Sequence, residues 1–219
     1  LLIDCGSDIR FSLQQQGLSY TDIDGVYISH LHADHVCGLE WVAFTTYFDK
    51  RCARPKMFCS ATISGPLWTQ SLRGGLESIE GQKMDLTGYF NLRKIPKNGH
   101  FVWEGIRFDL IQVVHIMSER SIKHSYGLMI YEDGKDSPKI FFTTDTQFCP
   151  NQIKRFYQEA ALILHDCETS PFKSGVHAHF DELVTLDPAF KSKMWLYHYQ
   201  PGACEQRDPV AKGFAGFVR

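Results

Sequence analysis

The stretch "YISHLHADHVCGLEW", residues 27–41, places three histidines and an aspartate within six consecutive residues. The apolar run before it predicts a buried strand, and residues 35–48 after it predict a helix. Side chains at positions i and i+2 of a strand end point the same way, so His30 and His32 can reach one ion. The turn that follows brings Asp34 and His35 toward a second ion. Because imidazole and carboxylate groups suit zinc and similar divalent ions, the stretch predicts a two-metal centre.

The rest of the chain alternates apolar, strand-like runs with helical segments, which indicates a mixed α/β fold. Several of these runs read as strands buried on both faces. A less regular stretch, 73–94, reads as a loop with a short helix that either covers the site or is a surface excursion. Strands are expected at 1–6, 25–30, 55–60, 108–116, 125–131, 139–145, 161–166 and 194–199, and helices at 7–16, 35–48, 62–72 and 150–160.

Composition restricts the class of protein. The chain has 219 residues, of which 43% are hydrophobic and 22% charged, as in ordinary globular domains, and we expect one domain over 1–219. The net charge of −2 disfavours a long polyanionic substrate. Seven cysteines without metal or redox spacing indicate reduced thiols, and with no signal peptide or membrane span visible we expect a cytoplasmic protein. The apolar start LLIDCG, without an initiator Met, leaves open that one or two strands precede it.

Three later residues are candidates to complete the metal centre. His115 lies in the apolar run 108–116, Asp145 ends KIFFTTD, and His198 ends MWLYHY. Each is a polar residue where a buried strand meets solvent. Asp145 is placed to bridge both ions.

The motif HLHADH, with His115, Asp145 and His198, resembles the HxHxDH pattern of the metallo-β-lactamase fold. The resemblance implies a four-layer αββα sandwich with the metals at one edge. It also implies the ligand sets, with Asp145 shared. These are His30, His32 and His115 for the first metal, and Asp34, His35 and His198 for the second.

Two further segments resemble the ribonuclease Z branch of that fold. They are LILHDCETS at 162–170 and HAHFDEL at 177–183. By this resemblance His177 assists catalysis and Asp166 orients it, with His179 as the alternative histidine. A solvated turn or helix start is the plain structural alternative for both histidines.

Two divalent ions can activate a hydroxide and bind a phosphate oxygen, which predicts hydrolysis of a phosphodiester bond. Asp34 is placed to accept the proton of the attacking water, and His177 to protonate the departing alkoxide. Zinc is the expected metal, with manganese as the alternative.

Ribonuclease Z enzymes usually carry a long basic arm that grips tRNA, and this sequence has no evident equivalent. The chain is more similar to compact relatives that hydrolyse cyclic nucleotides, including phage anti-Pycsar proteins that destroy cyclic CMP and cyclic UMP. The similar segments are LWTQSLRGGLESIEG at 67–81 and KMWLYHYQPG at 193–202. We therefore expect a small 3′,5′-cyclic nucleotide as substrate. Tyr89 or Phe90 could stack on its base, although both could equally pack beneath the loop.

The resemblance also implies a homodimer with loops that cross between subunits, and no membrane partner. Two alternatives remain at this point. One is a ribonuclease Z-like endonuclease that processes tRNA 3′ ends, the only reading in which a nucleic acid is the partner. The other is a non-catalytic binding or scaffolding module, against which the complete ligand set argues.

Overall fold

The structure is a computed structural model that describes residues 1–132 and 137–218. It contains two compact units, Leu1–Gly99 and His100–Arg219. The single domain over 1–219 expected from the sequence stays a prediction.

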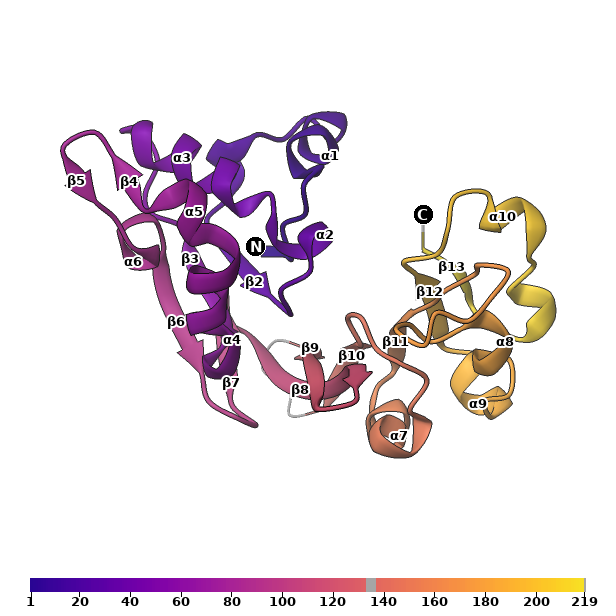
Figure 1. Ribbon diagram of the computed structural model, residues 1–219. Coiled ribbons are helices and arrows are strands. Elements are labelled where there is room, and N and C mark those ends of the chain that lie inside the picture. Colours follow the sequence, from indigo (N-terminus) through magenta and orange to yellow (C-terminus); the bar gives the residue numbers. More distant parts are fainter. Residues whose placement is uncertain (133–136, 219) are drawn as a thin grey trace. The chain divides into compact units, whose positions relative to one another are not determined.

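The first unit is built on a parallel four-stranded sheet with the order β1-β2-β3-β6 (Figure 1). Its strands are β1 (Leu2–Ile3), β2 (Gly25–Ile28), β3 (Lys56–Ser60) and β6 (Asn91–Ile95). The remaining elements are α1 (Ile9–Gln15), η1 (Tyr20–Asp22), α2 (Ala33–Val36), α3 (Leu39–Phe48), α4 (Ala61–Pro66), the π-helical η2 (Leu67–Leu72), α5 (Arg73–Leu76), α6 (Leu86–Tyr89) and the small pair β4 (Ser78–Ile79) and β5 (Gln82–Lys83). Because all four strands run the same way, their carboxyl ends meet at one edge of the sheet.

The second unit is built on a seven-stranded mixed sheet with the order β13-β12-β11-β10-β9-β8-β7. Four of its strands are parallel, namely β10 (Pro138–Phe142), β11 (Leu162–Asp166), β12 (Met194–Tyr197) and β13 (Gly216–Phe217). The other three are antiparallel, namely β7 (His100–Trp103), β8 (Ile106–Ser118) and β9 (Ser121–Tyr131). Its helices are α7 (Pro150–Glu159), α8 (Phe180–Leu183), α9 (Pro188–Lys191), α10 (Ala203–Gln206) and η3 (Val210–Lys212).

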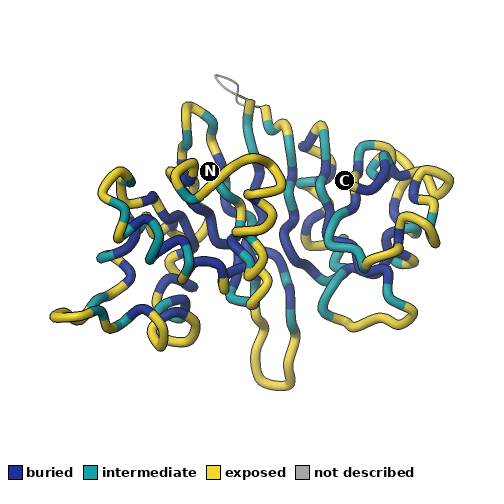
Figure 2. Tube along the Cα trace, turned by 90° about the horizontal axis from the view of Figure 1, so that it is seen from above, coloured by how far each residue is buried: buried dark blue, intermediate teal, exposed yellow. Residues whose placement is uncertain are grey.

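The core of each unit lies along its sheet. In the first unit β2 is buried at every position, as expected for a parallel strand covered on both faces. In the second unit α7 packs on β10 and α9 on β12, and their apolar side chains join one buried cluster with the strands. Figure 2 shows this pattern as long buried stretches along the chain that give way to exposed loops.

Each predicted strand and helix overlaps an observed element of the same type, with shifted ends. The predicted helix 35–48 is divided into α2 and α3, and stretch 73–94 contains two short helices and a small strand pair. Besides the small pair β4 and β5, the strands of the described residues that were not predicted are β6, β7 and β13. Strand β6 is mostly exposed and β13 has two residues, so neither gives an apolar period.

Helix length bears on membrane insertion. Helices α3 and α7, with ten residues each, are long among the helices of this chain. A membrane-spanning helix needs about 20 apolar residues. Within 1–132 and 137–218, no helix reaches the length and apolarity that crossing a bilayer requires.

Candidate metal centre

The histidine segment of the first unit follows the carboxyl end of β2 and is bound to the loop after β1. The backbone N–H of Cys5 donates to His35 O at 2.8 Å, and that of Gly38 donates to Cys5 O at 2.9 Å. A Cβ on Gly6 would lie 2.2 Å from Asp34 O, so only glycine permits this approach. The loop after β1 thus fixes the turn that carries the histidines.

Asp4, which the sequence analysis did not single out, orients this segment. Its Oδ2 accepts hydrogen bonds from His35 Nδ1 at 2.7 Å and from Ser29 Oγ at 2.6 Å, and its Oδ1 accepts one from Ser29 N at 2.8 Å. Asp4 has φ of 61°, a left-handed conformation that a non-glycine residue rarely adopts. The signal in the sequence was a carboxylate directly after an apolar strand, in LLIDCG.

These contacts assign the tautomers of two histidines. A carboxylate only accepts hydrogen bonds, so His35 Nδ1 carries a proton, and in the neutral ring Nε2 then presents a lone pair. Because the Ser29 hydroxyl donates to Asp4, it accepts from His30 Nδ1, at 3.0 Å, and in the neutral His30 ring the lone pair is likewise on Nε2. Neutral imidazole with a lone pair on Nε2 is the form that binds a metal ion.

The remaining acidic and histidine residues of the segment lie beside these two. The ring centroids of His30 and His32 are 4.7 Å apart, and those of His30 and His35 are 4.1 Å apart. Asp34 is exposed, with its Oδ2 3.4 Å from His35 Nε2. Candidate ligand atoms of Asp4, His30 and His35 all lie within 4.8 Å of one another.

In the second unit the candidate residues follow the ends of three parallel strands. Asp145 comes after β10, Asp166 is the last residue of β11, and His198 comes after β12. They meet at one edge because carboxyl ends of parallel strands do so. Their backbone is unusual there, since Thr144 has φ of 52° and His198 has φ of 63°. His115 lies within β8, at a register shift between Val114 and Ile116.

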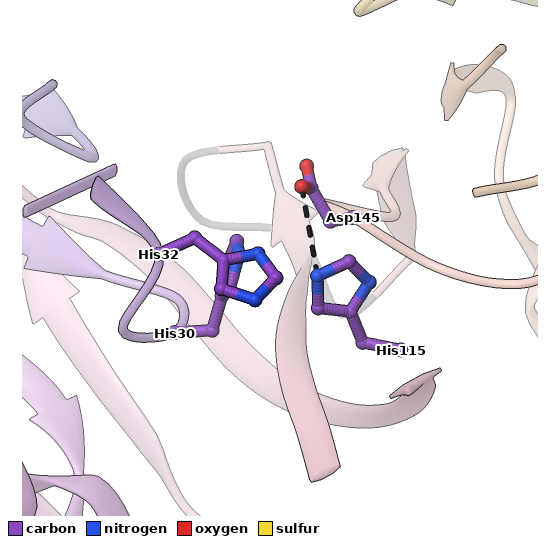
Figure 3. Close-up of side chains that lie close together, drawn as sticks. All are labelled: His30, His32, His115 and Asp145. Atoms are coloured by element: carbon purple, nitrogen blue, oxygen red, sulfur yellow. Dashed lines mark ion pairs between the residues drawn. The ribbon is translucent and has the colours of Figure 1, made fainter. Parts of the chain in front are cut away.

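The Asp145 carboxylate, which is 0% exposed, is approached by three imidazoles. Its Oδ2 lies 3.9 Å from His115 Nε2, 3.8 Å from His177 Nδ1 and 3.9 Å from His198 Nε2. Figure 3 shows the His115 ring facing this carboxylate. These distances are too long for hydrogen bonds. The distances to His115 and His198 suit a carboxylate and imidazoles that bind divalent cations at about 2.0–2.2 Å, so this donor set fits such ions.

His177 and Asp166 form a hydrogen-bonded pair beside these residues. His177 Nδ1 lies 2.8 Å from Asp166 Oδ2, and Asp166 Oδ2 also accepts a hydrogen bond from Thr146 N at 2.9 Å. Burial lowers the pKa of His177, but the hydrogen bond to Asp166 and the nearby carboxylates outweigh it and raise the pKa to about 8. Burial raises the pKa of Asp166 to about 6. The buried acid Asp166 therefore holds the His177 ring through Nδ1. The other ring nitrogen of His177, Nε2, takes no part in this hydrogen bond.

His179, the alternative to His177, has a different environment. It is buried and forms the N-cap of α8, with its Nδ1 accepting from Asp181 N at 3.3 Å. Its Nε2 donates to Ser170 O at 3.0 Å. Both ring nitrogens are therefore engaged in local structure.

Tyr89 and Phe90 are both fully buried, in line with the packed alternative that the sequence left open. The Tyr89 hydroxyl donates to Leu76 O at 2.9 Å, and its ring packs against Phe44 and Tyr47. Stacking on a base requires an accessible ring face. The structure offers none at these two positions, so we do not include them in the proposed substrate site.

A family model described as anti-Pycsar protein Apyc1 matches residues 1–219. The chain belongs to this family. A protein of the same name from Paenibacillus harenae is 36% identical over 201 residues, which cover 91% of this chain and 78% of the relative. The family resemblance read from the sequence is thus confirmed.

Solved structures confirm the fold. A metallo-β-lactamase fold protein, YhfI from Bacillus subtilis, superposes with a TM-score of 0.68 at 15% identity, covering 99% of this chain and 81% of YhfI. A diphosphatase of the PhnP family also gives a TM-score of 0.68, at 17% identity and coverage of 94% and 72%. The α/β fold is therefore the metallo-β-lactamase fold. With its family and its histidine and aspartate donors, the protein is a metal-dependent hydrolase.

Proposed function

We propose that this protein is a phosphodiesterase that uses two divalent metal ions to hydrolyse small 3′,5′-cyclic nucleotides. The observation that carries the proposal is the match of the whole chain to the anti-Pycsar family. The sequence resemblance associates that family with hydrolysis of cyclic CMP and cyclic UMP. The donor sets at the strand ends of each unit support the metal requirement.

The proposed ligands follow the family motif. One ion is assigned to His30, His32 and His115, and Asp145 is assigned to both ions. A second ion is assigned to Asp34, His35 and His198. Support comes from each unit separately, namely the Nε2 lone pairs of His30 and His35 in the first unit and the imidazoles around Asp145 in the second. Zinc is the proposed metal, with manganese as the alternative, because both accept nitrogen and oxygen ligands.

Bound divalent ions would supply activation of water and neutralisation of charge on the phosphate oxygens. The chain's own residues would move the protons. Asp34, whose carboxylate is exposed, would accept a proton from the attacking water. His177, protonated near neutral pH because its pKa is raised to about 8, would donate a proton from Nε2 to the departing 3′ oxygen. Asp166 would hold the His177 ring in that orientation through the 2.8 Å hydrogen bond.

In this proposal the products are a linear nucleoside monophosphate with a new P–OH group and a free 3′ hydroxyl. Water adds to phosphorus, and the bond from phosphorus to the 3′ oxygen breaks. The proposed physiological form is a homodimer in the cytoplasm, as the resemblance implies.

The proposal is tested by incubating metal-loaded protein with 3′,5′-cyclic CMP, UMP, AMP and GMP and with a precursor tRNA. We expect hydrolysis of cyclic nucleotides and no cleavage of the tRNA. Cleavage of tRNA alone would favour the ribonuclease Z-like endonuclease instead. If none of these substrates reacts, the phosphodiesterase assignment fails.

A further inference from the structure

The segment that carries His177, Thr169–Ala178, contains neither helix nor strand, so other contacts must hold it. Its C-terminal end is bound to the backbone of Glu168, the residue that directly precedes the segment. The N–H of Glu168 donates to Ala178 O at 2.8 Å, and the N–H of Phe180 donates to Glu168 O at 2.8 Å. Glu168 thus closes the segment into a loop.

The Glu168 side chain reaches into the same loop. Its Oε2 accepts hydrogen bonds from Ser174 N at 2.9 Å and from Ser174 Oγ at 3.0 Å. Glu168 is 5% exposed, and a carboxylate buried to this extent persists only with such partners. The Ser174 hydroxyl in turn accepts from Val176 N at 3.1 Å.

The two residues after Ser174 are held by side chains from other parts of the second unit. The side-chain amide of Gln147, two residues after Asp145, donates to Gly175 O. The Nδ1 of His115 donates to Val176 O at 3.1 Å. Gly175 has φ of 74°, which permits this turn at no steric cost. The loop residues Ser174, Gly175 and Val176 are therefore each bound by a different part of the second unit. Each of these parts also carries a candidate site residue.

This arrangement determines the state of two site histidines. A carbonyl oxygen only accepts hydrogen bonds, so Val176 O keeps a proton on His115 Nδ1, and in the neutral ring the lone pair is then on Nε2. The residue after Val176 is His177, which meets Asp166. The position of the loop therefore sets both the tautomer of His115 and the orientation of His177.

We propose that Glu168 is a positioning residue for the hydrolytic reaction, acting through Ser174 and Val176 on His115 and His177. The proposal rests on the proposed function for its effect on turnover. Outer residues that orient ligands typically contribute about 10- to 100-fold to activity or metal affinity.

The test uses Glu168→Ala and Ser174→Ala in the full chain, with Glu205→Ala as the matched control. Glu205 is an exposed glutamate of the same unit. Ser174 is also exposed, so its substitution removes the hydroxyl contacts with little effect on folding. For Glu168→Ala we expect kcat to fall about 10- to 100-fold while KM changes less than about threefold. Ser174→Ala should give a smaller loss and Glu205→Ala none.

A second readout does not depend on activity. Long-range proton–nitrogen NMR spectra of the imidazoles in metal-free protein report the tautomer of His115. In the parent protein and in Glu205→Ala the proton should stay on Nδ1, whereas both loop variants should show a mixture of tautomers. Glu168→Gln, which keeps an acceptor oxygen of the same shape, should restore part of the parent state.

Two results would overturn the proposal. One is an unchanged His115 tautomer in both Glu168→Ala and Ser174→Ala. The other is a kcat for Glu168→Ala, assayed with saturating metal, that equals the kcat of Glu205→Ala. If the parent protein hydrolyses no cyclic nucleotide, the proposed function fails, while the tautomer result still decides the role of Glu168.

Discussion

In the first unit the candidate ligands come from one segment of six residues, whereas in the second unit they come from three separate places between residues 115 and 198. The groups that orient the histidine side chains also differ between the two units. A single carboxylate, Asp4, fixes His35 directly and His30 through Ser29. In the second unit a loop bound by Glu168 and Gln147 fixes His115, and Asp166 fixes His177.

The difference shows two solutions to the same physical problem. A neutral imidazole binds a metal ion only when its other nitrogen carries the proton, and a hydrogen-bond acceptor must hold that proton in place. A contiguous motif allows one acceptor to serve several histidines. Ligands that are distant in sequence each need an acceptor of their own.

The largest expected effect tests whether both units supply ligands. His32→Ala in the first unit and Asp145→Ala in the second should each reduce bound metal and lower activity at least about 1,000-fold, because metal ions supply several kcal/mol of transition-state stabilisation. Metal content by elemental analysis and the cyclic-nucleotide assay measure both. His100→Ala, on the exposed part of β7, is the control and should retain both. Full metal content in either ligand variant would contradict the assignment for that unit.

The second test separates His177 from His179. His177→Ala should lose about 100- to 10,000-fold in turnover with its metal retained, since it removes the proposed acid and no ligand. His179→Ala removes an N-cap, so it should cost about 1 kcal/mol of stability and leave turnover of the folded protein unchanged. Equal turnover in the parent and His177→Ala would reject this acid.

The third test concerns a histidine of the second unit that is structural. His165 is fully buried, donates from Nδ1 to Asp166 O and accepts at Nε2 from the Tyr157 hydroxyl, both at 2.6 Å. Burial lowers its pKa from 6.5 to about 4. The neutral form is favoured on folding, so its contribution is complete above pH 6.5 and is lost as pH falls toward 4.

We therefore expect the free energy of unfolding of metal-free protein to fall by about 3 kcal/mol more in the parent than in His165→Gln between pH 7 and pH 4. Urea unfolding at several pH values measures this. Other titrating groups are common to both proteins and cancel in the comparison. Parallel pH profiles would show that His165 is not buried in its neutral form.

The smallest expected effect tests the shared acceptor of the first unit. Asp4→Asn keeps the size of the side chain but weakens its contacts with His35 and Ser29. We expect metal affinity to fall about 10- to 100-fold, less than for loss of a ligand, as measured by competition with a chelator. Asp22→Asn, at the exposed η1 turn, is the matched control. Unchanged affinity would mean that His30 and His35 are oriented without Asp4.

The sequence alone determined the fold family and the metal-binding chemistry. HLHADH is local, since a strand end and the turn after it place four ligand-type side chains together without help from distant residues. Alternating apolar runs gave the strands and helices for the same local reason. The short or exposed strands β6, β7 and β13 were not predicted, because sheet pairing, rather than an apolar period, defines them.

Tertiary structure decided how these residues are oriented. That Asp4 serves two histidines, that Glu168 reaches Ser174 and that both nitrogens of His179 are engaged depend on contacts across loops. Burial of Tyr89 and Phe90 is likewise a result of packing. A hydrogen bond depends on distances of about 3 Å between groups far apart in the chain, and only the folded backbone fixes such distances.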